Sequence, residues 1–564
     1  MTVSRLFWPA VACVAAVVGV LEVRSALDET QTWDEGIHIS AGYTYLVRGD
    51  YSWNLEHPPL VKLVSALPLT GLHLDVPVPV VDGKRRDQVQ YGIEFLYRNR
   101  VHADTILIVA RSANILLALL FVMALAWWTR RRFGPAAALL AVVLCAFDPN
   151  LIAHGRYVTT DFPVTVFYFF ACVLWVEYLE RGAFRSLLLA ALVFTTAMVT
   201  KFSAVLLIPT FVVLYAVGWV ERPKEFPLRR LAVAGGAIFA TLFAGVIAIY
   251  WPETVRCLTT RVPRLADVVN RGNMAGAILW RLGRTLHLPA HRFLVGLNAV
   301  AEHNTGGHAS YLMGLRSETG WWYYFPVVFA VKSTIAALAA AAIVLVNGIW
   351  RTVRAGFRGI PIMAVGLAFP PVLYFVLSMT SGINIGMRHI LPVYPFLYVG
   401  VAAALRSATA RAKACATVGL ALGLLQILEC RSIAPDYLAF FNALAGGPAN
   451  GPLYLADSNI DWGQDVKKLV HWLDAHGTRR VRVFYFGNAQ LRYYGVEELG
   501  FPGPRDQQGW NEIDDYCVAN VTPLLGNYVP LEELAQLRLR EPIAKVGWSM
   551  YVYDLRKPKP SPPR

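Results

Sequence analysis

A segment near the N-terminus carries three carboxylates and two imidazoles whose spacing could supply a general base and a site for a cation. Asp34 and His38 are four residues apart and would share one face of a helix. Acidic residues are also favoured in the first turn of a helix by its dipole, which is the structural alternative for Asp34 and Glu35. That alternative does not account for Glu56 and His57, because the two prolines that follow them exclude a helix there and fix a turn. We therefore expect a functional loop over this stretch.

A second acidic position, Asp161, lies at the start of a later apolar block and is followed closely by Pro163. An aspartate that caps a helix, with a proline in the first turn, would explain this pattern structurally. Ionisable residues at the ends of membrane helices are also frequent functional groups. The sequence leaves both interpretations open.

Basic side chains would be needed if the substrate carries a phosphate close to a bilayer. Lys201 is an ionisable residue within apolar sequence, and Arg388 offers a planar set of donors that suits a phosphate. His303 and His308 could bind a metal or sugar hydroxyls, although their spacing matches no strong metal pattern. The candidates for binding a phosphate are Lys201, Arg388 with His389 and, as a weaker one, Arg156.

The elements that must position these residues are membrane helices. The chain has 564 residues, of which 56% are hydrophobic and 16% are charged, and its mean hydropathy is +0.44. A soluble protein of this length would need more charged surface. Several apolar blocks reach the roughly 20 residues that a helix needs to cross about 30 Å of hydrocarbon, and shorter ones do so with their flanks. The blocks are Ile106–Trp128, Ala136–Phe147, Phe162–Tyr178, Leu187–Val199, Leu231–Trp251, Val327–Val346 and Ala416–Leu428.

The net charge of +14 follows the loops between these blocks and does not indicate a nucleic-acid partner. Arginine and lysine gather in alternate loops, as the positive-inside rule predicts for cytoplasmic loops. Counting from a retained first helix gives about eleven spans, with Lys201 at a turn between two helices near the outer face. We expect a protein of the inner membrane that contacts membrane lipids, with its C-terminus outside. The basic loops hold Arg130–Arg132, Arg181 and Arg185, Arg222–Arg230, Arg351–Arg358 and Arg406–Lys413.

The same topology divides the chain into two predicted domains. Residues 1–430 would form the transmembrane domain, with large outer loops over residues 28–104 and 253–319. Residues 431–564 have mixed polarity and would form a small soluble, extracytoplasmic α/β domain. Within it, composition and periodicity predict strands at Leu453–Ala456 and Val481–Phe486 and a helix at Asp461–His476.

Taken together and in this order, these residues resemble the C-type superfamily of membrane glycosyltransferases. The resemblance is closest to the branch of protein O-mannosyltransferases and aminoarabinose transferases. That branch has an acidic motif in the first outer loop, a Pro-Pro motif after it, an Asp that opens a later helix and a Lys in the next helix pair. The matching residues are Trp33-Asp34-Glu35, Glu56-His57-Pro58-Pro59-Leu60, Asp161 and Lys201, where His57 replaces a lysine that is usual in aminoarabinose transferases. Bacterial members with a soluble tail also resemble Gly307–Leu312, Arg388–Pro392 and Asp457–Asp465.

The resemblance implies a polytopic helical fold and transfer of a sugar from a polyprenyl-phosphate carrier to a hydroxyl outside the cytoplasm. The acceptor could be a protein, a lipid or a glycan, and mannosyl transfer is one option. Asp34 would be the base, with Glu35 and Asp161 in the same catalytic set. Glu56 would hold a divalent cation if one is required, and no organic cofactor is expected. The implied substrate-binding residues are His57, Lys201, Arg388, His389, His308 and Tyr311.

Other functions stay open at this point. A transporter or flippase of lipid-linked sugars would place its charges within spans rather than in loops. A non-catalytic scaffold would act through its soluble tail. The Asp457–Asp465 motif likewise has two interpretations, a capped turn between a strand and a helix or a part of an acceptor site.

Overall fold

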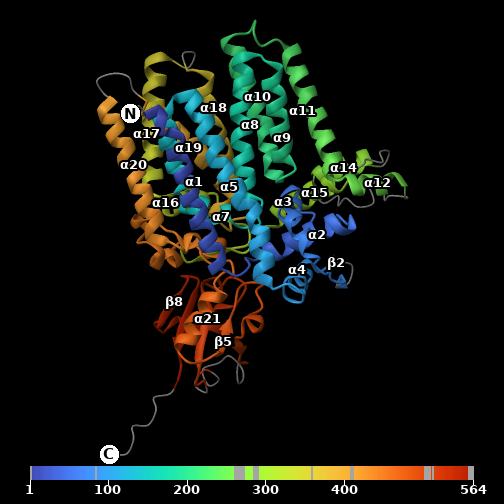
Figure 1. The fold of residues 1–564 in the computed structure, drawn as a ribbon, viewed down its shortest axis with the longest axis vertical. Coiled ribbons are helices and arrows are strands. Elements are labelled where there is room, and N and C mark those ends of the chain that lie inside the picture. The colour runs from blue at the N-terminus through green and yellow to red at the C-terminus, as the bar shows by residue number, and fades with distance from the viewer. Residues whose placement is uncertain are drawn as a thin grey trace, which may run out of the picture.

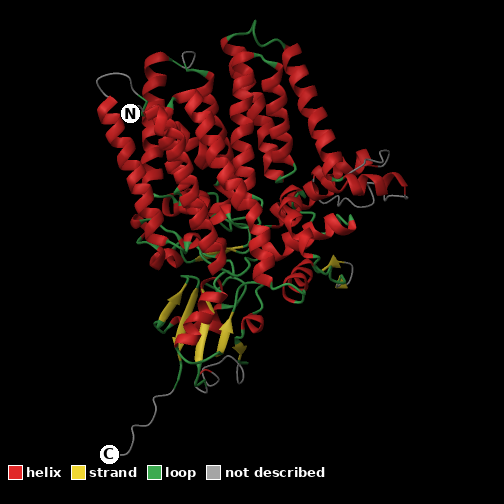
Figure 2. Ribbon diagram, in the orientation of Figure 1, coloured by secondary structure: helices red, strands yellow, loops and turns green. Residues whose placement is uncertain are grey.

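The structure is a computed structural model that describes residues 3–79, 81–82, 85–259, 274–283, 291–356, 360–406, 412–500, 510 and 513–556. Long helices pack side by side in one body, and a small domain from the C-terminal part lies at one end of it (Figure 1). The body is helical, whereas the larger sheet belongs to the C-terminal domain (Figure 2). The predicted outer loop over residues 253–319 falls partly outside the described residues, at 260–273 and 284–290.

Seven helices of the described chain are long and apolar enough to cross a membrane. In hydrocarbon every backbone polar group needs a partner within the protein, and a helix satisfies this need within its own segment. The chain is therefore a multi-pass membrane protein, as predicted. The seven are α1 (Val3–Asp28), α5 (Ala103–Phe133), α8 (Asp161–Arg181), α10 (Leu207–Glu221, with the short η2, Phe202–Leu206, before it), α11 (Leu228–Ile249), α17 (Ile335–Ala355) and α20 (Ala412–Ile433).

Further apolar helices are bent or short. α6 (Pro135–Ala146) and α7 (Pro149–Gly155) are bent by 66° and would form an eighth span if they count as one. The bend has a local cause, because a carboxylate oxygen of Asp148 accepts the first free amides of α7 and Pro149 starts that helix. Within the described residues the predicted number of about eleven spans stays a prediction. The shorter apolar helices are Leu60–Leu72, α9 (Phe184–Met198), α18 (Ile362–Ser378) and α19 (Val393–Ala404).

The N-terminal loop is folded as three helices that pack on one another. α3 (Leu60–Ala66) begins directly after Pro59, as predicted from the two prolines. α2 (Glu35–Arg48) is helical as predicted, and its first eleven residues are all buried. α3 and α4 (Gln88–Tyr97) cover it. The contact with α3 is close enough to need a glycine, since a Cβ on Gly42 would lie 2.1 Å from the carbonyl oxygen of Lys62.

The C-terminal domain contains a five-stranded mixed sheet with α21 (Val466–Ala475) packed on it through Leu469 and Leu473. The order of strands is β6 (Glu497–Glu498), β5 (Arg480–Phe484), β7 (Tyr516–Asn520), β9 (Met550–Asp554) and β8 (Ala544–Val546). β5 runs parallel to β6 and β7, and β9 is antiparallel to β7 and β8. The α/β prediction is confirmed.

Two boundaries predicted in this domain differ from the structure. Leu453–Ala456 is not a strand, because Leu453 ends a 3-10 helix (η7, Pro448–Leu453) and Leu455 makes only an isolated bridge to Leu312. The predicted helix begins at Val466 rather than at Asp461, because Gly463 adopts a left-handed backbone with φ of 84°.

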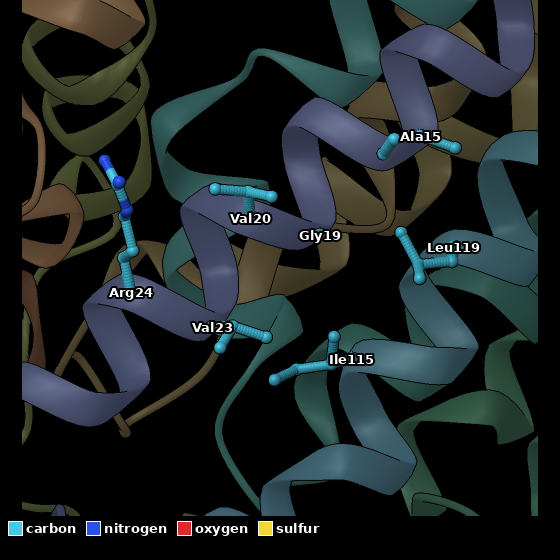
Figure 3. Close-up of a pocket in the computed structure, with 8 residues that line it drawn as sticks. Ala15, Gly19, Val20, Val23, Arg24, Ile115 and Leu119 are labelled. Carbon is cyan, nitrogen blue, oxygen red and sulfur yellow. The ribbon is translucent and has the colours of Figure 1, made fainter.

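An apolar groove of about 420 Å³ lies between α1 and α5 (Figure 3). Its lining combines small residues of α1, among them Gly19, with Ile115 and Leu119 of α5. Arg24 is the one charged residue among those that line it. The groove therefore offers no acid or nucleophile, and the candidate chemistry lies elsewhere.

Candidate active site

Four charged side chains of alternating sign form a chain where the helical body meets the C-terminal domain. Oδ2 of Asp34 accepts a hydrogen bond from Nη1 of Arg388 at 2.8 Å. The same Nη1 lies 3.7 Å from Oδ2 of Asp161, whose Oδ1 is paired with Nζ of Lys201. Asp161 is buried, whereas Asp34 is 22% exposed and so can be reached by a substrate. The structure thus brings together four residues that the sequence placed in four separate segments.

Each of the four takes its position from a helix end or a break between helices. Asp34 directly precedes α2, and its side chain makes no capping bond, which leaves the carboxylate for Arg388. Asp161 is the first residue of α8 rather than its N-cap, which is Thr160. Lys201 is extended between α9 and η2, so the predicted turn between two helices is confirmed. Arg388 lies in the short 3-10 helix η4 (Met387–Ile390).

Arg388 and His389 each have a nitrogen that is buried without a hydrogen-bond partner among the described residues, namely Nε of Arg388 and Nε2 of His389. Burial, reinforced by the positive charges of Lys201 and Arg388, lowers the pKa of His389 well below its usual value. The imidazole is therefore neutral at pH 7 and can donate from only one nitrogen. Buried polar nitrogens of this kind are costly unless a ligand satisfies them.

Glu35 is placed differently from its neighbour Asp34. Its carboxylate is fully buried, and Arg111 of α5 binds both oxygens, at 2.8 and 2.7 Å. The amides of Thr32 and Val158 donate to the same carboxylate at 2.9 and 3.1 Å. Burial alone would raise the pKa of Glu35, but Arg111 and these amides outweigh it and lower the pKa. Glu35 therefore ties the loop to α5, and its oxygens are already occupied.

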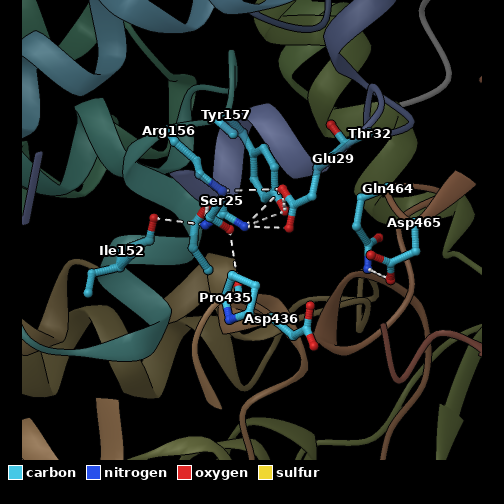
Figure 4. Close-up of polar contacts among 12 residues, drawn as sticks. Ser25, Glu29, Thr32, Ile152, Arg156, Tyr157, Pro435, Asp436, Gln464 and Asp465 are labelled. Carbon is cyan, nitrogen blue, oxygen red and sulfur yellow. Dashed lines mark hydrogen bonds and ion pairs between the residues drawn. The ribbon is translucent and has the colours of Figure 1, made fainter. Parts of the chain in front are cut away.

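Arg156, a weaker candidate for binding phosphate, is also committed to an internal pair. Its guanidinium donates to both carboxylate oxygens of Glu29, at 2.7 and 2.9 Å, and Tyr157 donates to the same carboxylate at 2.9 Å. Figure 4 shows these three side chains pointing toward one another. Nearby, the hydroxyl of Ser25 donates to the carbonyl of Pro435 at 2.6 Å. This cluster joins the end of α1 to the start of the C-terminal part.

The turn with Glu56 and His57 is held by a buried lysine that sequence analysis missed. Nζ of Lys62 donates to the carbonyl oxygens of Asn54 and His57, at 2.6 and 2.7 Å. The ring of His57 packs edge-on against that of His38 at 5.2 Å. Burial, with smaller effects from His38, Lys201 and Lys62, lowers the pKa of His57 well below its usual value, so the ring is neutral at pH 7.

Glu56 was the predicted ligand for a divalent cation. It is half-buried at the surface of the turn. In the part of the chain that the structure describes, no group of three or more His, Cys, Asp or Glu side chains could hold a metal ion. The predicted cation at Glu56 therefore stays a prediction, and no step of the reaction is assigned to a metal.

His308 and Tyr311 contact the C-terminal part of the chain. The hydroxyl of Tyr311 donates to the carbonyl of Pro452 at 3.0 Å, and the residue is buried in β3 (Ser310–Leu312). Nδ1 of His308 lies 3.4 Å from the hydroxyl of Tyr528, which donates to Asp457 at 3.1 Å. No hydrogen bond or ion pair found among the described residues links His308 or Tyr311 to the four-charge chain.

The Asp457–Asp465 motif is a buried segment that packs against the site rather than a surface turn with caps. Asp465 is at the N-cap position of α21 but makes no capping bond. Instead Ser458 donates to the carbonyl of Ile385 at 2.7 Å, and the amide of Met387 donates to Asn459 at 3.0 Å. The capped-turn interpretation is therefore wrong, and the motif supports the segment that carries Arg388.

The comparisons with solved structures cover nearly the whole chain, and the match to a family model covers the part that carries Asp161 and Lys201. Two solved structures cover 97% of this chain and 99% of their own, at 16% identity: ArnT from Cupriavidus metallidurans bound to undecaprenyl phosphate, with a TM-score of 0.48, and the same protein in the apo state, with a TM-score of 0.46. No match is found among curated protein sequences. Residues 104–251 match the family model of dolichyl-phosphate-mannose-protein mannosyltransferases. Over this region, from α5 to the end of α11, the chain is similar to that family, which confirms the predicted resemblance to membrane glycosyltransferases.

Proposed function

We propose that this protein is a membrane glycosyltransferase that moves a sugar from a polyprenyl-phosphate carrier to an acceptor hydroxyl. The ion pair between Asp34 and Arg388 is the observation that carries the proposal, because it joins a reachable carboxylate to a guanidinium that has a further donor unused. The match of residues 104–251 to a mannosyltransferase family supports it.

The reaction needs a base on the acceptor and a cationic group on the leaving phosphate. The acceptor oxygen forms a bond to the anomeric carbon of the sugar while the bond from that carbon to the phosphate oxygen breaks. The electron pair of the broken bond stays on the phosphate, and the acceptor proton goes to Asp34. Arg388 binds Oδ2 of Asp34, which leaves Oδ1 for the acceptor hydroxyl.

The basic half of the site suits a phosphate. Arg388 has a buried donor, and His389 a buried ring nitrogen, without a partner among the described residues, and Lys201 adds a second positive charge beside them. Preorganised donors of this kind stabilise charge that develops on a leaving oxygen. Before the donor binds, the two cations balance the two carboxylates of Asp34 and Asp161. A phosphate that binds the unused Nε of Arg388 adds a negative charge near Asp34, which favours uptake of the acceptor proton by that carboxylate.

The two ends of one helix support an orientation of the protein in the membrane. α5 begins at Ala103, near the first loop, and carries Arg130, Arg131 and Arg132 in its last turn. Basic residues mark the cytoplasmic ends of spans. The site lies at the opposite ends of the helices and would therefore be extracytoplasmic, together with the C-terminal domain (Figure 1).

The test is donor cleavage by the purified protein. It would be incubated in liposomes with a panel of polyprenyl-phosphate sugars, and release of the polyprenyl phosphate would be measured. Asp34→Asn should abolish release while leaving the amount of folded protein unchanged. Asp28→Asn is the matched control, because Asp28 is an exposed acid close by in the chain.

Two results would count against the proposal. If the wild-type protein releases no carrier from any donor of the panel, the proposed activity is wrong. If Asp34→Asn releases carrier at the wild-type rate, the activity stands but the base is another group.

A further inference from the structure

We propose that Trp462 is a positioning residue that holds Asp34 and Arg388 in the relative orientation of their ion pair. The guanidinium carbon of Arg388 lies 4.3 Å from the centre of the Trp462 ring. The carbonyl oxygen of Trp462 accepts the amide of Trp33, the neighbour of Asp34, at 3.0 Å. One buried residue of the C-terminal part thus contacts both sides of the ion pair. This inference rests on the proposed function for its kinetic consequence but not for its structural one.

The flat indole limits the orientation of a flexible side chain. An arginine has many rotamers, and a planar guanidinium that stacks on an aromatic face loses most of this freedom. Tryptophan is the aromatic side chain that attracts a cation most strongly, and the attraction is larger where water is excluded. The Trp462 side chain is only 2% exposed. The stacking therefore holds Nη1 of Arg388 toward Asp34 and leaves Nε for a ligand.

Trp462 is itself held on several sides. Its amide donates to the side chain of Gln464 at 2.8 Å. Its ring packs edge-on against the rings of Tyr157, at 5.8 Å, and His154, at 5.9 Å. Tyr157 belongs to the Glu29 cluster at the end of α1. The indole is thus fixed by the helical body and is a rigid support for Arg388.

The residues around Trp462 also connect the two segments that carry Asp34 and Arg388. On one side, Ser458 and Asn459 bind the backbone of the segment that carries Arg388. On the other side, the carbonyl of Gln464 accepts the amide of Thr30 at 2.8 Å. Asp34 and Arg388 are 354 positions apart in the chain, and this segment contacts the backbone next to both.

The experiment compares Trp462→Leu and Trp462→Phe with Trp472→Leu. Trp472 lies on α21 and stacks on His476 at 3.8 Å, so its loss removes a tryptophan of the same domain away from the site. Trp462→Leu should raise the KM for the polyprenyl-phosphate donor about ten-fold, because Arg388 loses its support. Trp462→Phe keeps a weaker aromatic face and should raise it about three-fold. Trp472→Leu should leave the donor KM unchanged.

A second measurement does not depend on activity. Amide hydrogen exchange should become faster over residues 28–36 and 384–391 in Trp462→Leu and stay at the wild-type rate there in Trp472→Leu. If Trp462→Leu does not fold, Trp462→Phe is judged by both measurements. Wild-type exchange in these segments together with an unchanged donor KM would overturn the inference. If the wild-type protein cleaves no donor, the proposed function fails, and the exchange comparison alone decides on Trp462.

Discussion

Glu35 and Arg111 form a buried pair with two hydrogen bonds directly beside the reachable carboxylate of Asp34. Adjacent acidic residues thus have opposite surroundings, since Glu35 is enclosed by donors and Asp34 is 22% exposed. A carboxylate whose oxygens are all bonded fixes the backbone that carries its neighbour. Within this dipeptide, Glu35 therefore has a structural role, whereas Asp34 is left for the chemistry.

Breaking this pair should destabilise the protein strongly. Glu35→Gln leaves the guanidinium of Arg111 buried without its counterion, which typically lowers the free energy of unfolding by about 3–5 kcal/mol. Denaturant unfolding in mixed micelles would measure the change. The control is Glu94→Gln, because Glu94 pairs with Arg98 near the surface and should change stability by less than about 1 kcal/mol. Equal effects of the two variants would show that the Glu35 pair contributes no more than a surface pair.

The reaction should depend on the planar shape of the Arg388 side chain as well as on its positive charge. Arg388→Ala should lower kcat/KM for the donor about 100-fold, through loss of stabilisation of the leaving phosphate. Arg388→Lys keeps the charge but loses the planar donors and the stacking on Trp462, and should lower it roughly ten-fold. Steady-state kinetics on the lipid donor would test both.

Arg354 provides the control for this series. Its guanidinium also stacks on a tryptophan, Trp350, at 4.3 Å, but it is exposed on α17. Arg354→Lys should leave kcat/KM unchanged. If Arg388→Lys behaves like Arg354→Lys, the planar donors are not used on the phosphate.

The burial of Asp461 predicts that the C-terminal domain is more stable in mild acid than at neutral pH. Burial raises the pKa of Asp461 to about 7, and this effect outweighs the hydrogen bonds from Asn520 and Thr522, which lower the pKa. The folded state then keeps a proton that the unfolded chain, with a carboxyl pKa of about 3.9, releases as pH rises. This stabilisation is complete below about pH 4 and is lost as pH rises to about 7, by at most about 1.4 kcal/mol per pH unit.

Asp461→Asn should remove the part of this pH dependence that comes from Asp461, whereas Asp465, whose pKa burial raises to about 6, keeps its own contribution. Oδ1 of Asn520 is buried without a partner among the described residues, and a flipped amide could use it for the protonated carboxyl or for the new asparagine. Denaturant unfolding between pH 4.5 and 7.5, followed by tryptophan fluorescence, would measure the slope. Asp474→Asn, at an exposed pair with Arg479, should retain the wild-type slope. A wild-type protein that is equally stable across this range would contradict the assignment.

The sequence predicts most of the fold and about half of the site. Apolar blocks and basic loops predict a multi-pass helical protein because hydrocarbon permits few other structures. The chemical types of Asp34, Asp161, Lys201 and Arg388 indicate candidates, since such residues are costly at membrane ends. Their pairing could not be predicted, because it depends on how distant helix ends meet.

Arg111 is the residue that the sequence could have revealed. It lies within an apolar block, and an arginine there needs a buried acidic partner. Trp462 lies in the Asp457–Asp465 motif that the sequence indicated, but nothing in that motif predicts its contact with Arg388, because a tryptophan in a tail domain is usually part of a core. The error at Leu453–Ala456 has a similar origin, since a short apolar run does not distinguish a strand from other buried structure.

The contacts of Trp462 with Trp33 and Arg388 also have a consequence for biosynthesis. Thr30 and Gln464, which meet beside the site, are 434 positions apart, so the first loop is made long before its partner segment. The membrane helices can insert in order as they emerge, but Arg388 has no support until the chain has been made past residue 464. The site is therefore complete only near the end of synthesis, and a shortened chain would enter the membrane as a partly assembled protein.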